Sequence, residues 1–377
     1  MKHVKTIGIV GGGQLGRMLT QAAVALGYQV VVVNPSDNSP AAQVGAQEIV
    51  GDLYDEQALT QLGKVSDVVT VEIEHLNADV LAQIAKAGKH VHPSPETLKL
   101  IQDKYLQKVF LKKAGIPAAD FMEVKSPADA KKALKIYGGK MLLKTKHGAY
   151  DGRGNALISS AEELKNALEQ FGEQELYAEA FVPFTKELAV MVARSTKSEI
   201  KTYPVVETFH ERNICVEVHA PAEVDLGVQK KAEALAAQAA KELKGAGVFG
   251  IEMFLTGEGE VLINEIAPRV HNSGHYTIEA CKTSQFEQHI KAITGMPLGS
   301  TAMKVPAAVM INILGERDGE TTVGGLEAAE AVPDTAVHIY GKSPTKVDRK
   351  MGHITATGKT MKEAQARAQK ARKAISI

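Results

Sequence analysis

The feature that most constrains this chain is a glycine-rich turn between a short apolar run and a helical stretch near its start. Residues 7–16 read IGIVGGGQLG, so Gly11, Gly13 and Gly16 fit the pattern G-x-G-x-x-G. Glycine permits a tight turn there and lets backbone N–H groups approach a phosphate at the start of a helix. The turn therefore predicts a strand–turn–helix unit, which serves either as a phosphate site or as a purely structural turn.

The first ~95 residues alternate β-branched runs with helical stretches, which is typical of a parallel α/β sheet. The sequence predicts strands over residues 6–10, 29–34 and 67–73, and helices over residues 15–25 and 77–86. Two prolines within residues 92–95 then remove backbone donors and interrupt regular structure. We therefore expect a Rossmann-like parallel-sheet domain over residues 1–95.

Beyond residue 95 the helical and strand patterns no longer alternate regularly. The predicted elements are helices over 96–114, from 126, from 160 and over 225–243, a strand over 141–146, adjacent strands over 176–182 and 186–194, and a hairpin over 249–256 and 260–266. A smaller α/β tail follows residue 297, with strands near 307–314 and 336–340. We expect a central domain over residues 96–297, a small C-terminal domain over 298–377, and a mixed α/β and α+β fold.

The composition excludes several classes of function. Lys and Arg together number 44, as do Asp and Glu, so the chain lacks the basic excess of a duplex nucleic-acid binder. Its apolar runs fall far below the ~20 residues that span a membrane, and its start lacks the apolar core of a signal peptide. Two cysteines without a Cys-x-x-Cys pair suit a reducing compartment. We expect a cytoplasmic enzyme with neither a nucleic-acid nor a membrane partner.

The glycine turn lacks one requirement of dinucleotide sites, an acidic residue ~20 positions on that holds the ribose. Asn34 stands there, so we expect no NAD(H) binding and favour the phosphate of a substrate. Glu72 and Glu74 alternate at the carboxyl end of a predicted strand and share one face. Ligands of open α/β sheets gather at such ends, although two solvated edge carboxylates would have the same pattern.

A lysine within an apolar strand, together with the loop behind it, predicts a polyphosphate site. Lys144 lies in the run MLLKT, and a lysine is rarely buried unless an anion pairs with it. The loop over residues 147–155 contains three glycines and Arg153, so backbone donors and one cation could close over phosphates. This loop is not a Walker A sequence, and mobile surface loops look similar.

The predicted hairpin over residues 249–266 brings two glutamates together. With a two-residue turn at Glu258 and Gly259, Glu252 stands directly opposite Glu265, with Cβ atoms ~5 Å apart. Opposed like charges destabilise a sheet unless a cation neutralises them, and Mg²⁺ held by carboxylates and nucleotide phosphates would do so. A shifted register, which leaves one glutamate in solvent, is the alternative.

Residues 264–275 extend this cluster with further polar groups. Arg269 could hold a transferring phosphoryl group or a small oxyanion. His271 and His275 have the spacing of a helical zinc pair, but Gly274 weakens a helix there and no third ligand stands at a familiar interval. We therefore prefer an anion-binding loop over a zinc site.

Taken together, these motifs resemble the ATP-grasp superfamily and, more closely, the family of 5-(carboxyamino)imidazole ribonucleotide synthetases of bacterial purine synthesis. The resemblance runs along essentially the whole chain, and the order and spacing of its pieces make it specific. The pieces are GGGQLGRM at 11–18, EIE at 72–74, YDGRG at 150–154, NEIAPRVHNSGH at 264–275, YGK at 340–342 and RKMGH at 349–353. The resemblance implies an ATP-grasp fold of three domains, with ATP between the two lobes of the central one.

The nucleotide and metal residues of that family correspond to defined positions of this chain. By resemblance, the ATP-binding residues are Lys104, Lys144, Tyr150, Asp151, Gly152, Arg153, Gly154, Asn155, Glu179, Ala180, Phe181, Val182, Glu187, His210, Asn264 and Glu265. Within this set, Glu187 binds the ribose hydroxyls and residues 179–182 border the adenine. The resemblance also implies that Glu252 and Glu265 carry Mg²⁺ or Mn²⁺, which together with ATP is the expected cofactor.

The remaining implied residues bind the second substrate or take part in the chemistry. The resemblance assigns to substrate binding Gly13, Gln14, Leu15, Glu74, Asp151, Asn272, Ser273, Lys342 and Arg349. It assigns to catalysis Tyr150, Asp151, Arg153, Arg269 and His271. Lys342 and Arg349 would complete a phosphate site, although by themselves they would pass for surface charges.

The implied reaction is phosphorylation of bicarbonate by ATP to carboxyphosphate, whose CO₂ then carboxylates the exocyclic amine of 5-aminoimidazole ribonucleotide. The expected partners are therefore ATP, bicarbonate and that ribonucleotide, within a homodimer. Two alternatives stay open: a formate-dependent glycinamide ribonucleotide transformylase of the same superfamily, and a non-catalytic nucleotide-sensing protein with an ATP-grasp core. The complete set of lysines, paired glutamates and arginine argues against the sensor.

Overall fold

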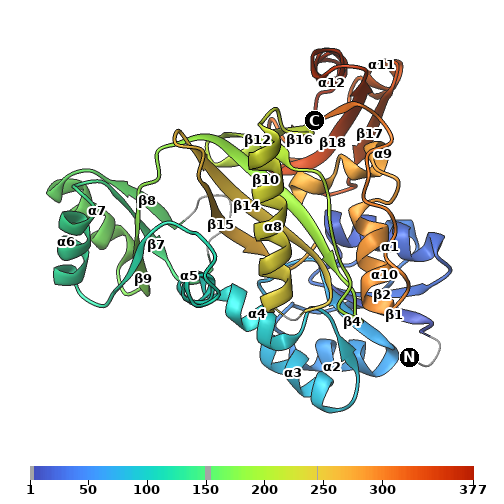
Figure 1. Cartoon of the computed structure of the whole chain (residues 1–377). Helices are drawn as coiled ribbons and strands as arrows, with labels where there is room; N and C mark the ends of the chain where they lie inside the picture. The colour runs from blue at the N-terminus through green and yellow to red at the C-terminus, as the bar shows by residue number, and fades with distance from the viewer. Residues whose placement is uncertain (1–3, 149–153, 244) are drawn as a thin grey trace.

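The structure is a computed structural model, and it describes residues 4–148, 154–243 and 245–377. Within these residues the strands form three sheets: an N-terminal sheet, a small sheet and a long sheet. Figure 1 shows the N-terminal sheet in blue, the small sheet at the far left, and the long sheet running from the centre toward the red C-terminal part. No helix in the described part of the chain is both long and apolar enough to cross a membrane.

The N-terminal sheet is parallel throughout, with the strand order β3-β2-β1-β4-β5, as predicted for this region. Its elements are β1 (Thr6–Val10), α1 (Gln14–Ala25), β2 (Gln29–Asn34), η1 (Ala42–Val44), β3 (Gln47–Val50), α2 (Glu56–Val65), β4 (Val68–Val71), α3 (Ala78–Lys86) and β5 (His90–Val91). The three central strands are mostly valine and isoleucine and almost wholly buried, as a sheet covered on both faces requires. The sequence analysis missed β3 and β5, because β3 is half polar and β5 has two residues.

The small sheet is antiparallel, with the order β6-β9-β7-β8, and forms one lobe of the central region. Its elements are β6 (Phe121–Val124), α6 (Pro127–Ile136), β7 (Met141–Thr145), β8 (Asn155–Ile158), α7 (Ala161–Phe171) and β9 (Leu176–Ala180). Ser126 and Ser160 cap the two helices by accepting hydrogen bonds from the N–H groups three residues on. The two helices pack on the sheet in a hydrophobic core of its own.

The long sheet has the order β15-β14-β10-β12-β13-β16-β18-β17, with β11 paired to β10. Its strands are β10 (Phe184–Arg194), β11 (Ile200–Thr202), β12 (Val206–Glu211), β13 (Ile214–Ala220), β14 (Gly247–Thr256), β15 (Val261–Ala267), β16 (Ala307–Leu314), β17 (Thr335–Ile339) and β18 (Lys350–Gly358). Strand β13 pairs with β16, so the C-terminal strands extend the central sheet instead of forming a separate one. The C-terminal part therefore reaches the central lobe through continuous backbone hydrogen bonds.

Eight further helical segments complete the fold of the described residues. They are α4 (Pro95–Gln102), α5 (Lys104–Lys113), α8 (Leu226–Leu243), η2 (Asn272–Gly274) with α9 (Thr277–Ala280), α10 (Gln285–Thr294), α11 (Leu326–Glu330) and α12 (Met361–Ala374). Helix α8 packs its alanine-rich face on β10 and β14 (Figure 1). Helix α10 lies between the N-terminal sheet and the long sheet, where it contacts α1, β4, β10 and β14.

Two predictions about the central region were wrong. The helix predicted over residues 96–114 is two helices, because Asp103 has an extended backbone and its side chain caps α5 by accepting a hydrogen bond from the N–H of Leu106. The strands predicted as neighbours over 176–182 and 186–194 lie in different sheets, as β9 and β10. Local strand propensity does not specify which sheet a strand joins.

A buried histidine forms hydrogen bonds to both the N-terminal sheet and the long sheet. His289 on α10 accepts a hydrogen bond from the N–H of Val248 at Nδ1, and its Nε2 lies 2.8 Å from the hydroxyl of Thr70 on β4. Since Nδ1 accepts, Nε2 carries the proton and donates to Thr70. Burial, and then the charge of His92, lowers the pKa of His289 to about 3, so this link is uncharged at neutral pH.

Candidate active site

The hairpin of β14 and β15 brings Glu252 directly opposite Glu265, as predicted. The predicted two-residue turn was wrong, because the pairs nearer the turn are offset by one residue and the loop comprises residues 257–259. Gly259 in this loop has a left-handed backbone, with φ of 78°. A bulge that leaves Asn264 unpaired takes up the offset and restores the pairing of the two glutamates.

The two carboxylates are partly exposed and incompletely neutralised. Desolvation, and then repulsion by Glu265, raises the pKa of Glu252 to about 7. Lys104 Nζ lies 3.2 Å from Glu265 Oε2, and His271 Nε2 lies 3.5 Å from Glu252 Oε1. Burial lowers the pKa of His271 well below its usual value, so this imidazole supplies no positive charge at neutral pH. Two opposed carboxylates, of which Glu265 is paired with a lysine and Glu252 with a neutral imidazole, have the chemistry of a divalent-cation site.

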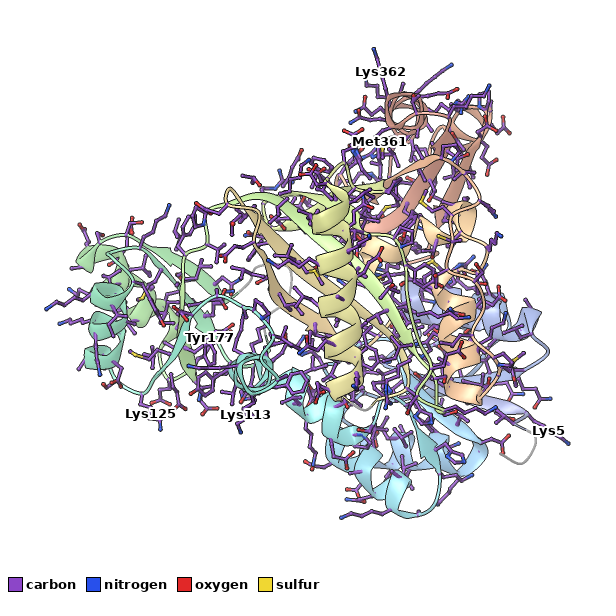
Figure 2. The ribbon with its side chains drawn as sticks, viewed as in Figure 1. Lys5, Lys113, Lys125, Tyr177, Met361 and Lys362 are labelled. Carbon is purple, nitrogen blue, oxygen red and sulfur yellow. The ribbon has the colours of Figure 1, made fainter. Side chains whose placement is uncertain are left out.

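Beside this pair, two lysines enclose a buried glutamate. Lys144 Nζ on β7 lies 2.9 Å from Glu179 Oε1, and Lys108 Nζ on α5 lies 2.8 Å from Glu179 Oε2. Tyr177, labelled in Figure 2, stands opposite Lys144 in the β7–β9 register. The Glu179 carboxylate thus faces the two lysines. The sequence analysis missed Lys108, whose only signal is its position one helical turn after Lys104.

The predicted ribose residues come together across neighbouring strands. Glu187 Oε2 on β10 lies 2.9 Å from His210 Nδ1 on β12, and this carboxylate raises the pKa of His210 although burial opposes the shift. Ala180 ends β9, and Phe181 and Val182 form the link to β10, so their backbone groups border the two lobes.

The glycine-rich loop over residues 147–155 is described at its two ends, residues 147–148 and 154–155. Gly154 accepts a hydrogen bond from the N–H of Thr145 at its carbonyl, and Asn155 begins β8 opposite Lys144. The other predicted loop residues, Tyr150, Asp151, Gly152 and Arg153, lie outside the described residues. Gly154 and Asn155 therefore connect the end of this loop to the strand that carries Lys144.

At the glycine-rich turn, Glu72 occupies the space beneath the start of α1. Its carboxylate accepts hydrogen bonds from the N–H groups of Gly13 at 2.6 Å and Gly16 at 2.5 Å. A Cβ atom at Gly13 would lie 2.6 Å from Glu72 Oε1, so this position requires glycine. Because Glu72 engages Gly13, the first-turn N–H groups of Gln14 and Leu15 are the ones that a ligand could use.

Glu74 is paired within the protein. Arg269 donates from Nε to Oε2 of Glu74 at 2.6 Å and from a terminal nitrogen to Oε1 at 3.1 Å. Although burial opposes the shift, this bidentate pair lowers the pKa of Glu74. The pair joins the end of β4 to the segment after β15, so Glu74 and Arg269 are neighbours of one site.

The loop after Arg269 is held by hydrogen bonds to the protein. The hydroxyl of Ser273 lies 2.9 Å from His271 Nδ1. The amides of Asn272 and Asn312 exchange two hydrogen bonds, at 2.9 Å and 2.6 Å. The side chains of Asn272 and Ser273 therefore shape the loop in this structure, and Asn312, which the sequence analysis missed, anchors it to β16.

The histidines of this loop do not form a helical zinc pair. Residues 272–274 form the short helix η2, and His275 turns to Gln285, whose amide lies 3.1 Å from its Nδ1. His271 instead faces Ser273 and Glu252. The preference for an anion-binding loop over a zinc site agrees with these partners.

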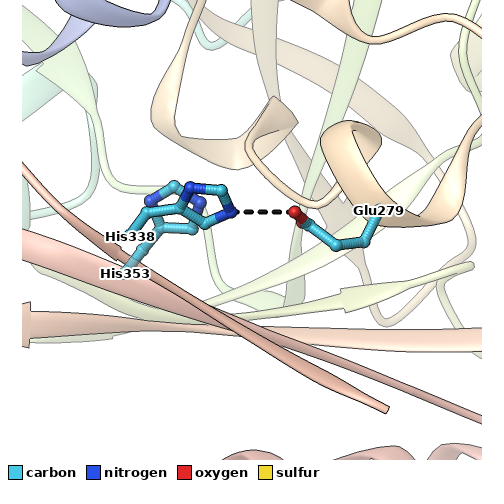
Figure 3. Close-up of side chains that lie close together, drawn as sticks. All are labelled: Glu279, His338 and His353. Carbon is cyan, nitrogen blue, oxygen red and sulfur yellow. Dashed lines mark hydrogen bonds and ion pairs between the residues drawn. The ribbon is translucent and has the colours of Figure 1, made fainter. Parts of the chain in front are cut away.

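A second histidine cluster lies where α9 meets the C-terminal strands, and Figure 3 shows its members, Glu279, His338 and His353. Their candidate ligand atoms all lie within 4.8 Å of one another. The two rings, however, are stacked, with centroids 4.4 Å apart and planes 15° from parallel. Imidazole lone pairs lie in the ring plane, so one ion would sit far out of both planes. The cluster is therefore a packed seam, with His338 Nε2 2.8 Å from Glu279 Oε1.

The predicted phosphate-binding cations lie in the C-terminal part, and Lys342 is close to the glycine turn. Both are half buried, and Lys342 and Arg349 each donate to a backbone carbonyl. The charge of Lys342 acts on Glu72, which places this lysine near the start of α1. Gln43 also donates a hydrogen bond to the carbonyl of Gly341 at 3.0 Å. The fold thus brings together residues separated by some 300 positions in the sequence.

Comparisons with protein families match three successive parts of the chain. Residues 4–102 match the ribonucleotide synthetase preATP-grasp domain, and residues 109–286 match the ATP-grasp domain. Residues 308–367 match the phosphoribosylaminoimidazole carboxylase C-terminal domain. The order of these domains agrees with the order of the N-terminal sheet, the central lobes and the C-terminal strands.

Full-length relatives match over almost the whole chain. The N5-carboxyaminoimidazole ribonucleotide synthase of Bacillus subtilis is 40% identical over 349 residues, which cover 93% of this chain and 90% of that protein. The phosphoribosylaminoimidazole carboxylase of Ogataea methanolica is 46% identical over 373 residues, covering 96% of this chain and 68% of that protein. The chain thus spans about two thirds of the length of such eukaryotic relatives.

Solved structures share the fold over the same extent. N5-carboxyaminoimidazole ribonucleotide synthetase from Thermotoga maritima is 44% identical, with a TM-score of 0.90 over 99% of both chains. The Aspergillus clavatus synthase, solved with ADP and 5-aminoimidazole ribonucleotide, is 40% identical, with a TM-score of 0.92 over 99% of both chains. This chain therefore belongs to the N5-carboxyaminoimidazole ribonucleotide synthetase family of ATP-grasp proteins.

Proposed function

We propose that this chain catalyses the ATP- and bicarbonate-dependent carboxylation of the exocyclic amine of 5-aminoimidazole ribonucleotide. The products are N5-carboxyaminoimidazole ribonucleotide, ADP and phosphate. The observation that carries the proposal is the opposed pair Glu252 and Glu265 beside three lysines, Lys104, Lys108 and Lys144. Opposed carboxylates beside clustered ammonium groups suit phosphoryl transfer from a metal-bound nucleotide. The ligands of the Aspergillus clavatus relative support the same substrates.

At the nucleotide end, we assign the ATP phosphates to Lys104, Lys144 and the loop over 150–155. The backbone of 180–182 borders the adenine, and Glu187 with His210 binds the ribose. Mg²⁺ or Mn²⁺ fits Glu252 and Glu265, with Asn264 beside them, because the raised pKa of Glu252 marks a carboxylate that lacks a counter-charge. When bound, the ion neutralises charge on the transferring phosphoryl group.

At the opposite end, we assign the phosphate of the ribonucleotide to the N–H groups of Gln14 and Leu15 and to Lys342 and Arg349. Glu74 lies beside this end, where its free lone pairs could accept from the ribonucleotide. The N–H of Gly13 donates a hydrogen bond to Glu72, which supports leaving this N–H group out of the phosphate site. The hydrogen bonds that Asn272 and Ser273 make within the protein support a role for these two residues in shaping the loop.

The chemistry follows from the groups between the two ends. A bicarbonate oxygen attacks the γ-phosphorus, and the bond to the departing ADP oxygen breaks, which gives carboxyphosphate. Arg269 and His271 hold the bicarbonate and the developing negative charge. Carboxyphosphate then releases phosphate and CO₂, and the amine nitrogen of the ribonucleotide bonds to the carbon of CO₂. We propose Asp151 as the acceptor of the amine proton, with Tyr150 and Arg153 in the same closing loop, which excludes water.

We propose three domains, over residues 1–95, 96–297 and 298–377, a homodimeric assembly, and a cytoplasmic location. The three successive family matches support the number of domains, although β16 to β18 continue the central sheet across the last boundary. The absence of a basic excess supports small molecules, rather than nucleic acid, as partners.

One assay tests the proposed function. ATP hydrolysis is measured with bicarbonate, with and without 5-aminoimidazole ribonucleotide, and in parallel with formate and glycinamide ribonucleotide. We expect hydrolysis to rise with bicarbonate and the aminoimidazole ribonucleotide. Stimulation by formate and glycinamide ribonucleotide alone would instead identify the transformylase, and absence of hydrolysis under every condition would identify a nucleotide sensor.

A further inference from the structure

Three charged side chains, each from a different element, meet in a buried cluster. Lys108 on α5 and Lys144 on β7 flank Glu179 on β9, with N–O distances of 2.8 Å and 2.9 Å. Their side chains are 3%, 9% and 1% exposed, respectively. The roles assigned to the metal pair and to the adenine border do not account for Lys108 or for the carboxylate of Glu179.

The three groups carry one net positive charge. The two lysines lower the pKa of Glu179 to about 2, although burial opposes the shift, so this carboxylate is ionised. Two ammonium groups and one carboxylate leave a charge of +1 in a site nearly without water. Uncompensated buried charge is costly, and it is tolerated where an anion completes the site.

The geometry around Lys108 points in the same direction. Its ammonium lies 2.8 Å from Glu179 Oε2, which is a close ion pair. Burial lowers the pKa of Lys108, and the charge of Glu179 opposes that shift. Lys108 and Glu179 therefore stabilise each other's charged forms.

We propose that Lys108 is a positioning residue that neutralises Glu179 and thereby leaves the charge of Lys144 available for the nucleotide phosphates. This inference rests on the proposed nucleotide site. Without Lys108, Lys144 and Glu179 would form a neutral pair, and the field at the phosphates would weaken. Glu179 would then act as a competitor of the nucleotide for Lys144, instead of an anchor that fixes the position of its ammonium.

The test is a charge-rescue series read out by nucleotide binding. Calorimetric titration with ADP and Mg²⁺ gives Kd without bicarbonate or ribonucleotide. We expect Lys108→Met, which keeps the length of the side chain, to raise Kd by about tenfold. Adding Glu179→Gln to that variant removes the competing anion and restores one net positive charge. The double variant should therefore bind within about threefold of the unchanged protein.

Two controls accompany the series. Lys113→Met changes an exposed lysine on the same helix, labelled in Figure 2, and should leave Kd unchanged. Lys108→Arg keeps the charge and should retain most of the affinity. In steady-state assays, Lys108→Met should raise the KM for ATP far more than it lowers kcat, because the metal pair and Arg269 are intact.

The outcomes separate the inference from the proposed function. If the unchanged protein does not bind ADP, the proposed nucleotide site itself is wrong. If it binds and Lys108→Met binds equally well, or if the double variant binds as poorly as Lys108→Met, charge neutralisation by Lys108 is refuted. Should Lys108→Met fail to fold, Glu179→Gln alone decides, because its site carries two net positive charges and must bind ADP more tightly.

Discussion

The two ends of the proposed site hold their charges in different ways. At the nucleotide end, Lys144 and Glu179 are 9% and 1% exposed and pair at 2.9 Å. At the phosphate end, Lys342 and Arg349 are half buried and donate to backbone carbonyls. The first end is therefore an ion-paired interior, whereas the second is a partly hydrated surface between the N-terminal and C-terminal parts.

This difference predicts how strongly each end depends on single charges. In a dry site the effective dielectric is low, so removal of one charge changes the energy of its neighbours strongly. At a half-exposed site water and salt screen each cation, so its loss costs less. Substitutions at the nucleotide end should therefore abolish function, whereas substitutions at the phosphate end should weaken binding.

The largest expected effect is at the metal pair. Glu265→Gln should reduce ATP turnover to below about 1% of the unchanged protein, because an amide cannot replace an anionic Mg²⁺ ligand. The fold should stay intact, since the substitution keeps the shape of the side chain and removes repulsion of Glu252. Steady-state hydrolysis at saturating magnesium, with a thermal unfolding curve as control, provides the test. Near-normal turnover would refute the metal assignment.

The next effect concerns the nucleotide lysine on β7. Lys144→Ala should remove both bicarbonate-dependent ATP hydrolysis and carboxylation of the ribonucleotide, because it deletes a phosphate contact and leaves Glu179 with Lys108 alone. Both activities are measured on the same preparation. If either activity survives at more than a small fraction, the nucleotide end depends on the charge of Lys144 less than the burial of this lysine implies.

An intermediate effect is expected at the phosphate end. Lys342→Ala and Arg349→Ala should each raise the KM for 5-aminoimidazole ribonucleotide ten- to a hundredfold, as expected from loss of a charge-assisted contact of ~1.5–3 kcal/mol. Slow hydrolysis of ATP with bicarbonate alone should survive, because the metal pair and the nucleotide lysines are unchanged in these variants. A KM change of less than about twofold would mean that the two cations are surface charges and that the C-terminal part lies outside the substrate site.

The smallest effect concerns the junction outside both ends. His289 has a folded pKa of about 3 and an unfolded pKa near 6.5, so its contribution to stability is complete above pH 6.5 and is lost as pH falls toward 3. Stability should therefore fall by up to about 1.4 kcal/mol per pH unit below 6.5. Denaturant unfolding at several pH values measures this slope, which His289→Gln should flatten. If His289→Gln leaves the slope unchanged, other groups cause the loss of stability at low pH.

Much of the fold followed from local pattern. The glycine turn and the valine-rich runs predicted β1, α1 and β2 because parallel strands need apolar residues on both faces. The same local reasoning failed at Asp103, where one capping side chain divides a helix that apolar periodicity alone would continue. It also failed for β3, whose polar residues conceal a strand that pairs through its backbone.

The sequence by itself determined many of the elements and their order, the family and the opposed pair Glu252 and Glu265. Only the tertiary structure decided the partner of each charge: Glu74 meets Arg269, 195 positions away, and Glu179 meets Lys108 as well as Lys144. The physical reason is one of range. Element type and hairpin register depend on neighbours in the chain, whereas burial and charge pairing depend on which distant elements pack together, as when β13 and β16 join two domains in one sheet.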